Sequence, residues 1–263
     1  MNSRLPLDEY ADDDAAALYD LQYDDWDDDL ALYEQFARRG ETPSLELCVG
    51  SGRVALHLAR AGLDVVGIDA SPQMLARLHA KLSAATAAHV RTVEADARDF
   101  DLGERFDLVY CALNSFELLP TTGDQIAALQ CAARHLAPAG VYVMQLRSPV
   151  HADWGADPAP LVLEWTRRDP ATSEMVQKTS SRRVSRERQS ELHTIVFDRT
   201  GSDGVVRRRT LEVALRLTAL PELELLLQRA SLRLTHVYGD PDLSPYTDDS
   251  DTMIIVAEAT ERP

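Results

Sequence analysis

Hydrophobic and polar positions follow two different periods along the chain. Between residues 44 and 146, short apolar runs that predict strands alternate with stretches whose apolar residues recur every three or four positions, as in helices. The predicted strands are 45–48, 65–68, 90–93, 106–112 and 140–146, and the predicted helices are 54–61, 72–82 and 124–136. A repeated strand–helix–strand order forms crossover units, so we expect an α/β fold with a doubly wound, mostly parallel sheet.

The pattern changes in the second half of the chain. Four β-rich segments follow one another between residues 161 and 217, separated by turn sequences such as Asp169-Pro170. Consecutive strands joined by turns predict an inserted antiparallel β-sheet subdomain. A helix at 221–230 and strands at 232–238 and 252–257 then complete the first sheet, whose last strand is antiparallel.

The N-terminal region is acidic and aromatic. Residues 27–38 have the periodicity of a helix, and the stretch before them carries Tyr10, Tyr19, Tyr23 and Trp26 among acids, which fits a short helix, a lid or a mobile arm. We therefore divide the chain into an N-terminal arm and helix, a core, an inserted sheet and the end of the core. Their ranges are 1–40, 41–146, 147–218 and 219–263.

Charge and hydropathy exclude several classes of protein. The net charge of −16 argues against binding to a nucleic acid backbone, which requires a basic surface. No apolar run approaches the roughly 18 residues that span a bilayer, and no signal peptide begins the chain, so we expect no membrane association and a cytoplasmic location. Cys48, Cys111 and Cys131 show neither disulfide nor zinc spacing, so we expect no metal.

The charges are unevenly distributed. Acids crowd the first thirty residues, whereas arginines crowd residues 147–216. The arginine-rich insertion fits a solvated sheet face, a surface for a phosphorylated substrate, or a surface for the acidic N-terminal arm of a partner subunit.

A glycine loop follows the first predicted strand in the sequence SLELCVGSGR, residues 44–53. Glycines here let the strand turn sharply into a helix and let a ligand approach the backbone. Gly50 and Gly52, with Asp69 after the second strand, also fit the dinucleotide fingerprint, which leaves an NAD(P)-dependent oxidoreductase open. Glu46 favours another ligand. We expect it at the mouth of the sheet, where a cationic ammonium or sulfonium would be its partner and a pyrophosphate would be repelled.

With Glu46-Leu-Cys-Val-Gly50-Ser-Gly52, the chain resembles the class I S-adenosylmethionine-dependent methyltransferases, which have a Rossmann-like fold, over nearly its whole length. The first motif of that family reads acid-x-Gly-x-Gly-x-Gly, and here Cys48 stands where the first glycine belongs. The resemblance implies that S-adenosylmethionine is the cofactor and that Asp69 binds its ribose hydroxyls. It also implies further cofactor contacts for Ala70, Met74, Asp96, Ala97 and, through the strand carbonyls, Cys111.

The acceptor is less defined than the cofactor. The fourth strand ends in Leu113-Asn114-Ser115, unlike methyltransferases that act on DNA, and the inserted sheet and aromatic arm resemble small-molecule enzymes, including those that N-methylate amino sugars. The resemblance implies that the inserted sheet forms a wall of the acceptor pocket and a homodimer contact. It also implies that Tyr19 and Tyr23 close over the cofactor. An amine acceptor is favoured over a hydroxyl, and a non-catalytic module that binds S-adenosylmethionine remains an alternative.

A sulfonium is an activated methyl donor, so such an enzyme mainly holds an electron pair in line with the S–CH3 bond and excludes water. We expect Glu117, Asn114 and Tyr23 to be catalytic, with Glu117 as the base. Candidates for contact with the acceptor are Phe116, Arg147, Trp154 and His193. Each of these side chains also has an ordinary structural interpretation, such as packing, helix capping or a salt bridge.

Overall fold

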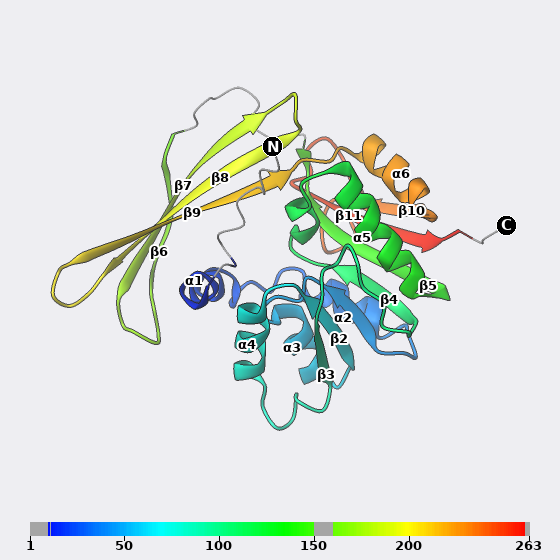
Figure 1. Ribbon diagram of the computed structural model, residues 1–263, viewed down its shortest axis with the longest axis horizontal. Coiled ribbons are helices and arrows are strands. Elements are labelled where there is room, and N and C mark those ends of the chain that lie inside the picture. Colours follow the sequence, from blue (N-terminus) through cyan, green and yellow to red (C-terminus); the bar gives the residue numbers. More distant parts are fainter. Residues whose placement is uncertain (1–9, 11, 150–159, 261–263) are drawn as a thin grey trace.

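A computed structural model describes residues 10, 12–149 and 160–260, so Trp154 lies outside the described residues. Its larger sheet has seven strands in the order β10-β11-β5-β4-β1-β2-β3 (Figure 1). The bounds are β1 Ser44–Leu47, β2 Val65–Asp69, β3 Val90–Glu94, β4 Phe106–Cys111, β5 Leu136–Arg147, β10 Leu232–Tyr238 and β11 Thr252–Ala259. The first five are parallel, and β11 is antiparallel to both of its neighbours. The predicted doubly wound sheet with an antiparallel last strand is confirmed.

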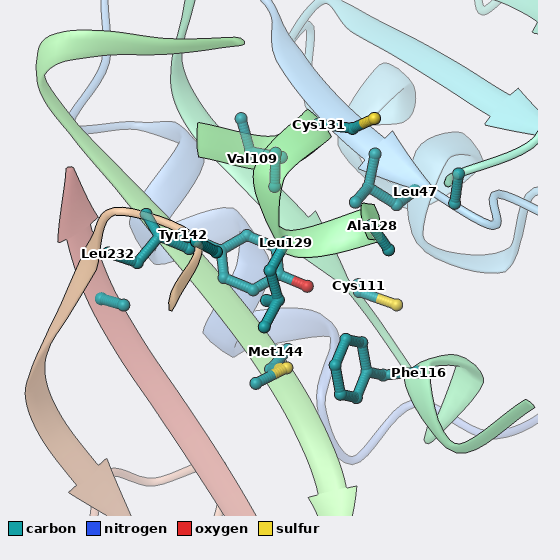
Figure 2. Packing of buried hydrophobic residues seen from close by; sticks show 14 of the residues in the cluster. Leu47, Val109, Cys111, Phe116, Ala128, Leu129, Cys131, Tyr142, Met144 and Leu232 are labelled. Carbon is teal, nitrogen blue, oxygen red and sulfur yellow. The ribbon is translucent and has the colours of Figure 1, made fainter. Parts of the chain in front are cut away.

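Helices cover both faces of this sheet because alternate side chains of each strand point to opposite sides. Leu108 and Tyr110 of β4 pack with α2 (Leu30–Ala37), α3 (Arg53–Arg60) and α4 (Pro72–Lys81). Val109 and Cys111 face the opposite way and pack with α5 (Thr122–His135) and α6 (Leu220–Arg229). Figure 2 shows this second layer, in which Leu129 of α5 lies against Tyr142 and Met144 of β5.

The inserted sheet is separate from the first and consists of four antiparallel strands in the order β6-β7-β8-β9. Their bounds are β6 Val162–Arg168, β7 Met175–Ser185, β8 Ser190–Thr200 and β9 Val206–Arg216. The strands are long and twisted and project away from the helical layers (Figure 1). The predicted antiparallel insertion is confirmed.

The N-terminal stretch forms a helix, α1 (Asp13–Tyr23), which lies between the inserted sheet and α4 (Figure 1). It begins at Asp13 because the carboxylate of Asp12 accepts hydrogen bonds from the backbone nitrogens of Asp14 and Ala15. Ala15 and Leu18 pack on apolar residues of the inserted sheet. The helix predicted from residue 27 begins instead at Leu30, after a turn that ends at Asp29. None of the described helices has both the length and the apolar character needed to cross a membrane.

Candidate active site

At the centre of the parallel sheet the order of the strands changes direction: β2 and β3 lie on one side of β1, and β4 and β5 lie on the other. Strand β1 pairs with β2 on one side and with β4 on the other, so the connections that leave β1 and β4 diverge. In open α/β sheets, ligands bind at such a switch point, beyond the carboxyl ends of the strands. Asp69 is the last residue of β2, and the glycine loop and Asn114 follow the carboxyl ends of β1 and β4, which are neighbouring strands here.

The glycine loop has the backbone shape that its residues predict. Gly52 has a φ of 86°, and a Cβ atom on it would lie 2.6 Å from Cγ of Leu78, so only glycine fits. Gly50 has a φ of 56°, and its missing Cβ leaves space next to Met74. Cys48 also has a positive φ, of 57°, which costs a residue with a side chain roughly 1–2 kcal/mol. That geometry explains why a glycine suits this position in related loops.

Asp69 fixes the loop and presents an acceptor to the crevice. Gly50 N donates to Oδ2 of Asp69 at 2.8 Å, and Ser71 N donates to Oδ1 at 2.8 Å. Burial raises the pKa of Asp69, whereas these backbone hydrogen bonds oppose the rise. Each carboxylate oxygen keeps capacity for a further donor, so the side chain can accept both hydroxyls of a ribose.

Glu46 is buried, with 3% of its surface exposed, rather than at the mouth of the sheet. The hydroxyl of Tyr110 donates to its Oε2 at 2.9 Å, so the chain itself supplies a neutral partner where we expected a cationic ligand. The reason is tertiary, because Tyr110 lies opposite Glu46 in the pairing of β1 with β4. Burial raises the pKa of Glu46 to about 8.

The residues predicted to contact the adenine follow the ends of β2 and β3 or lie on α4. Met74 and Ala97 are buried, and Ala70 is exposed. Asp96 is partly exposed and pairs with Arg98, whose Nη2 lies 2.6 Å from Oδ2; this hydrogen bond lowers the pKa of Asp96. Carboxylates beyond two neighbouring strands can accept from hydroxyl and amino groups, and this chemistry fits the ribose and adenine of S-adenosylmethionine. The individual cofactor contacts stay predictions.

A cavity of about 120 Å³ lies beyond the end of β4, between α1 and the inserted sheet. It is lined by Tyr10, Tyr23, Leu113, Asn114, Ser115, Leu118, Arg147, Lys178, Arg182, His193, Ile195, Val213 and Leu215. The structure thus brings together four predicted residues from distant parts of the sequence, namely Tyr23, Asn114, Arg147 and His193. Another cavity, of about 840 Å³, lies at the opposite edge of the sheet, where β4 and β5 begin, which is not where such sheets bind ligands.

Two polar atoms around the smaller cavity are buried and have no hydrogen-bond partner among the residues that the structure describes. They are Oδ1 of Asn114 and Nε2 of His193. The backbone next to them is strained, because Leu113 and Asn114 have φ values of 48° and 63°. Unsatisfied buried polar atoms and left-handed residues both cost free energy, and both concentrate at functional sites. The cavity therefore has the properties of a binding site.

Glu117 and Phe116 are next in sequence to residues that line this cavity but do not line it themselves. Phe116 is part of the hydrophobic core, as Figure 2 shows. The carboxylate of Glu117 accepts hydrogen bonds from N of Arg147 at 2.8 Å, from Nε at 2.9 Å and from Nη2 at 2.7 Å. Burial raises the pKa of Glu117, and the charge of Arg147 opposes this. The guanidinium also reaches Glu191 of β8 at 3.1 Å, so Arg147 connects the parallel core to the inserted sheet.

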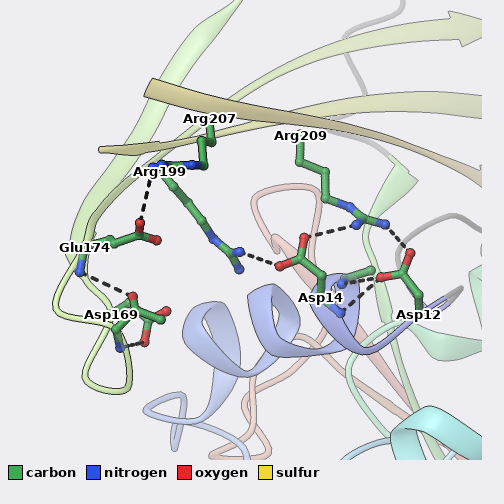
Figure 3. Close-up of polar contacts among 9 residues, drawn as sticks. Asp12, Asp14, Asp169, Glu174, Arg199, Arg207 and Arg209 are labelled. Carbon is green, nitrogen blue, oxygen red and sulfur yellow. Dashed lines mark hydrogen bonds and ion pairs between the residues drawn. The ribbon is translucent and has the colours of Figure 1, made fainter. Parts of the chain in front are cut away.

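Helix α1 is held by ion pairs on two sides. Asp14 pairs with Arg199 and Arg209 of the inserted sheet, and Asp12 pairs with Arg209 at 2.6 Å (Figure 3). On the other side, Asp20 lies 2.5 Å from Nε of Arg77 in α4. These acids and arginines belong to one chain, so the protein's own N-terminal segment pairs with part of the arginine-rich insertion, whereas Arg207 and Arg208 are 58% and 63% exposed. Tyr19 of this helix packs against Tyr23 with the two rings tilted by 50° and their centroids 4.8 Å apart.

Sequence analysis missed three charged residues at the site. Lys178 and Arg182 line the cavity, and Glu164 lies next to it, with Oε2 2.7 Å from Nζ of Lys178. A signal was present in residues 176–182, where Val176, Lys178, Ser180 and Arg182 occupy one face of a strand. Polar residues that follow an apolar one on the same face indicate where a sheet stops covering the core and starts lining a site.

Comparison with known proteins agrees with this geometry. Residues 45–140 match the family described as a methyltransferase domain. The chain is 30% identical to the cypemycin N-terminal methyltransferase of a Streptomyces species over 81% of this chain and 82% of that protein.

Two solved structures are similar over most of the chain. The CcbJ methyltransferase from Streptomyces caelestis is 24% identical, with a TM-score of 0.75, over 88% of this chain and 93% of that one. The sugar N-methyltransferase KedS8 from a Streptoalloteichus species is 25% identical, with a TM-score of 0.68, over 91% and 92%. The oxidoreductase that the glycine loop left open is therefore excluded, and the chain belongs to the S-adenosylmethionine-dependent methyltransferases.

Proposed function

We propose that the protein transfers a methyl group from S-adenosylmethionine to an amine nitrogen of a small molecule. The observation that carries this proposal is the pair of unpartnered atoms at the cavity, Oδ1 of Asn114 and Nε2 of His193. An amide oxygen accepts hydrogen bonds, and Nε2 accepts when the imidazole proton is on Nδ1. A primary amine or its ammonium form presents two or more N–H bonds and can satisfy both atoms, whereas a hydroxyl presents one O–H bond.

The size of the cavity supports a particular mode of binding. At about 120 Å³ it is smaller than the roughly 300–1,000 Å³ of a pocket that encloses a drug-sized ligand. It therefore suits the reacting end of an acceptor, with the remainder extending past Arg182, whose side chain is 52% exposed. Two similar proteins are an N-terminal methyltransferase and a sugar N-methyltransferase, and both names describe transfer to nitrogen.

In this mechanism the chain's own residues bind the cofactor and orient the acceptor. S-adenosylmethionine, when bound, supplies an activated methyl group on a sulfonium. Asp69 and Asp96 hold the ribose and adenine, and the glycine loop lets the backbone approach the ligand. Tyr19 and Tyr23 of α1 close over the site and exclude water, so that Asn114 can hold the acceptor nitrogen in line with the methyl group.

The test is a methyl-transfer assay with matched acceptors. The full chain is incubated with S-adenosylmethionine and either an amino sugar or the same sugar with a hydroxyl in place of the amine. We expect S-adenosylhomocysteine and a singly or doubly methylated product with the amine alone. The Asp69→Ala variant serves as the control for cofactor-dependent turnover. If only the hydroxyl sugar were methylated, the proposal of transfer to nitrogen would be wrong and the protein would transfer the methyl group to oxygen.

We also propose that the inserted sheet forms a homodimer contact. Supporting this, Leu161, Val162 and Leu163 are exposed at or next to the edge strand β6, and edge strands that are both apolar and exposed readily pair with another chain. Light scattering after size-exclusion chromatography tests the proposal. A dimer that Val162→Lys converts to a monomer supports it, and a monomeric parent protein contradicts it.

A further inference from the structure

The inner face of the inserted sheet is divided into an apolar half and a polar half. Val176, Ile195 and Phe197 pack against Ala15 and Leu18 of α1. Further along the same strand faces, at intervals of two residues, lie Lys178 and Ser180 on β7 and His193 on β8. Lys178 and His193 line the cavity. The polar half of the face is therefore positioned against the acceptor site.

These polar residues converge on Glu164 of β6. Nζ of Lys178 lies 2.7 Å from Oε2, the hydroxyl of Ser180 donates to Oε1, and Nε2 of His193 lies 3.8 Å from Oε1. Lys178 is 2% exposed and the side chain of His193 is 12% exposed. Burial raises the pKa of Glu164, but the neighbouring His193 ring and the hydrogen bonds from Lys178 and Ser180 outweigh it and hold the pKa below its usual range. Glu164 is therefore an anion at neutral pH.

His193 is the member of this cluster whose chemistry is unused. Its Nε2 is buried and makes no hydrogen bond within the described part of the chain, although a carboxylate lies 3.8 Å away. A proton placed on Nε2 would create an imidazolium next to the Glu164 anion, which stabilises it. Lys178 and Arg182 on β7 and Arg147 on β5 also line the cavity and oppose a cation there. With its ring proton on Nδ1, His193 has a lone pair on Nε2 that can accept a hydrogen bond.

Glu117, the base expected from the sequence, is less suited to that role. Its two oxygens accept three hydrogen bonds from Arg147, and its side chain lies outside the cavity lining. His193 and Asn114 both line the cavity, and they come from different elements, one from β8 and one from the segment after β4. An acceptor nitrogen that donates one N–H bond to each of them would be held in the cavity by both.

We infer that His193 is the general base that deprotonates the acceptor ammonium and that Glu164 is the positioning residue that stabilises the resulting imidazolium. This inference rests on the proposed amine acceptor. In the step, one N–H bond of the ammonium breaks, its proton moves to Nε2 of His193, and its electron pair stays on nitrogen. That pair forms the new N–CH3 bond as the S–CH3 bond breaks and its electrons go to sulfur. The imidazolium then returns its proton to solvent.

The experiment measures kcat/KM against pH for the full chain and three variants, His193→Gln, Glu164→Gln and His57→Gln. His57 is a matched control, because it lies on α3 and pairs with Glu34 away from the cavity. We expect His193→Gln to lower kcat/KM at pH 7 by at least about tenfold. This loss in kcat/KM should become smaller as the pH rises towards the pKa of the acceptor amine, because solvent then removes the proton from the amine instead. Glu164→Gln should give a smaller loss with the same pH dependence, and His57→Gln none.

A second measurement separates catalysis from folding. Affinity for S-adenosylhomocysteine should be unchanged in His193→Gln, and added imidazole should restore part of the rate of His193→Ala. An active parent enzyme whose His193 variants lose nothing, or lose the same factor at every pH without rescue, would overturn the inference and leave the proposed function intact. A parent enzyme that methylates the hydroxyl sugar and not the amine would overturn both.

Discussion

Arg147 and Glu117 form a partly buried ion pair in which the guanidinium Nη2 lies 2.7 Å from the carboxylate Oε2, whereas Arg233 and Glu258 form an exposed pair of the same length. The side chain of Glu117 is 3% exposed, and that of Glu258 is 43% exposed. The two pairs share this distance but differ in burial and in hydrogen bonding, because Glu117 accepts from N, Nε and Nη2 of Arg147 whereas Glu258 accepts from Nη2 of Arg233. Their contributions to stability should therefore differ.

Glu117→Gln should lower the free energy of unfolding by about 3–5 kcal/mol, because it leaves Arg147 without its main counter-charge in a desolvated place. Glu258→Gln should cost about 1 kcal/mol or less. Denaturant unfolding measures both. Turnover should fall in Glu117→Gln while affinity for S-adenosylhomocysteine is retained, because Arg147 then loses its position at the cavity. Equal stability losses in the two variants would contradict the structural role of this pair.

Asp69→Ala should weaken S-adenosylhomocysteine binding by more than about tenfold, because it removes the acceptor of two ribose hydroxyls and the partner of Gly50 N. Isothermal titration calorimetry measures the change. Asp101→Ala is the control, since the side chain of Asp101 is 84% exposed and lines the cavity at the other edge of the sheet. Unchanged affinity in Asp69→Ala would place the cofactor elsewhere.

Glu46 should make stability depend on pH. Its pKa is raised from 4.5 to about 8 in the folded protein, so between these values the folded state binds more protons than the unfolded state. The contribution of Glu46 to stability is present below pH 4.5 and is lost as the pH rises through 8. Glu46→Gln should therefore make Tm fall less between pH 5 and 8, because it removes about 1 kcal/mol per pH unit from the pH dependence of the free energy of unfolding. Glu224→Gln, on the exposed face of α6, should leave the slope unchanged; an identical slope in Glu46→Gln would refute the assignment.

Asp14→Asn should loosen helix α1, because Asp14 pairs with both Arg199 and Arg209 (Figure 3). These pairs are partly exposed, so we expect a loss of about 1 kcal/mol in the free energy of local opening, and less at high salt. Hydrogen exchange of amides 13–23 measures it. Asp13→Asn, an exposed neighbour on the same helix, is the control. Exchange that is equally slow in both variants would show that apolar packing alone holds α1.

The fold was predictable because its determinants are local. The periods of two and 3.6 residues identify strands and helices within short windows, and Ser71 and Thr121 cap α4 and α5 as their positions suggest. Boundaries were less accurate. Strand β5 begins at Leu136 rather than residue 140, because pairing of Leu136 with Phe106 recruits residues that lack strand periodicity. Such pairing depends on residues far away in the sequence.

The sequence by itself located the predicted cofactor site, because the glycine loop, Asp69 and Asp96 lie at or just after the ends of strands that local patterns predict. It also named Tyr23, Asn114, Arg147 and His193 as candidates on the acceptor side, but only tertiary structure brought them to one cavity. Glu164 meets Lys178 and His193 through sheet register, and Glu117 meets Arg147 across 30 positions of the chain. Local patterns assign a residue to a strand face. Only packing decides which face is covered by a helix and which one lines a cavity.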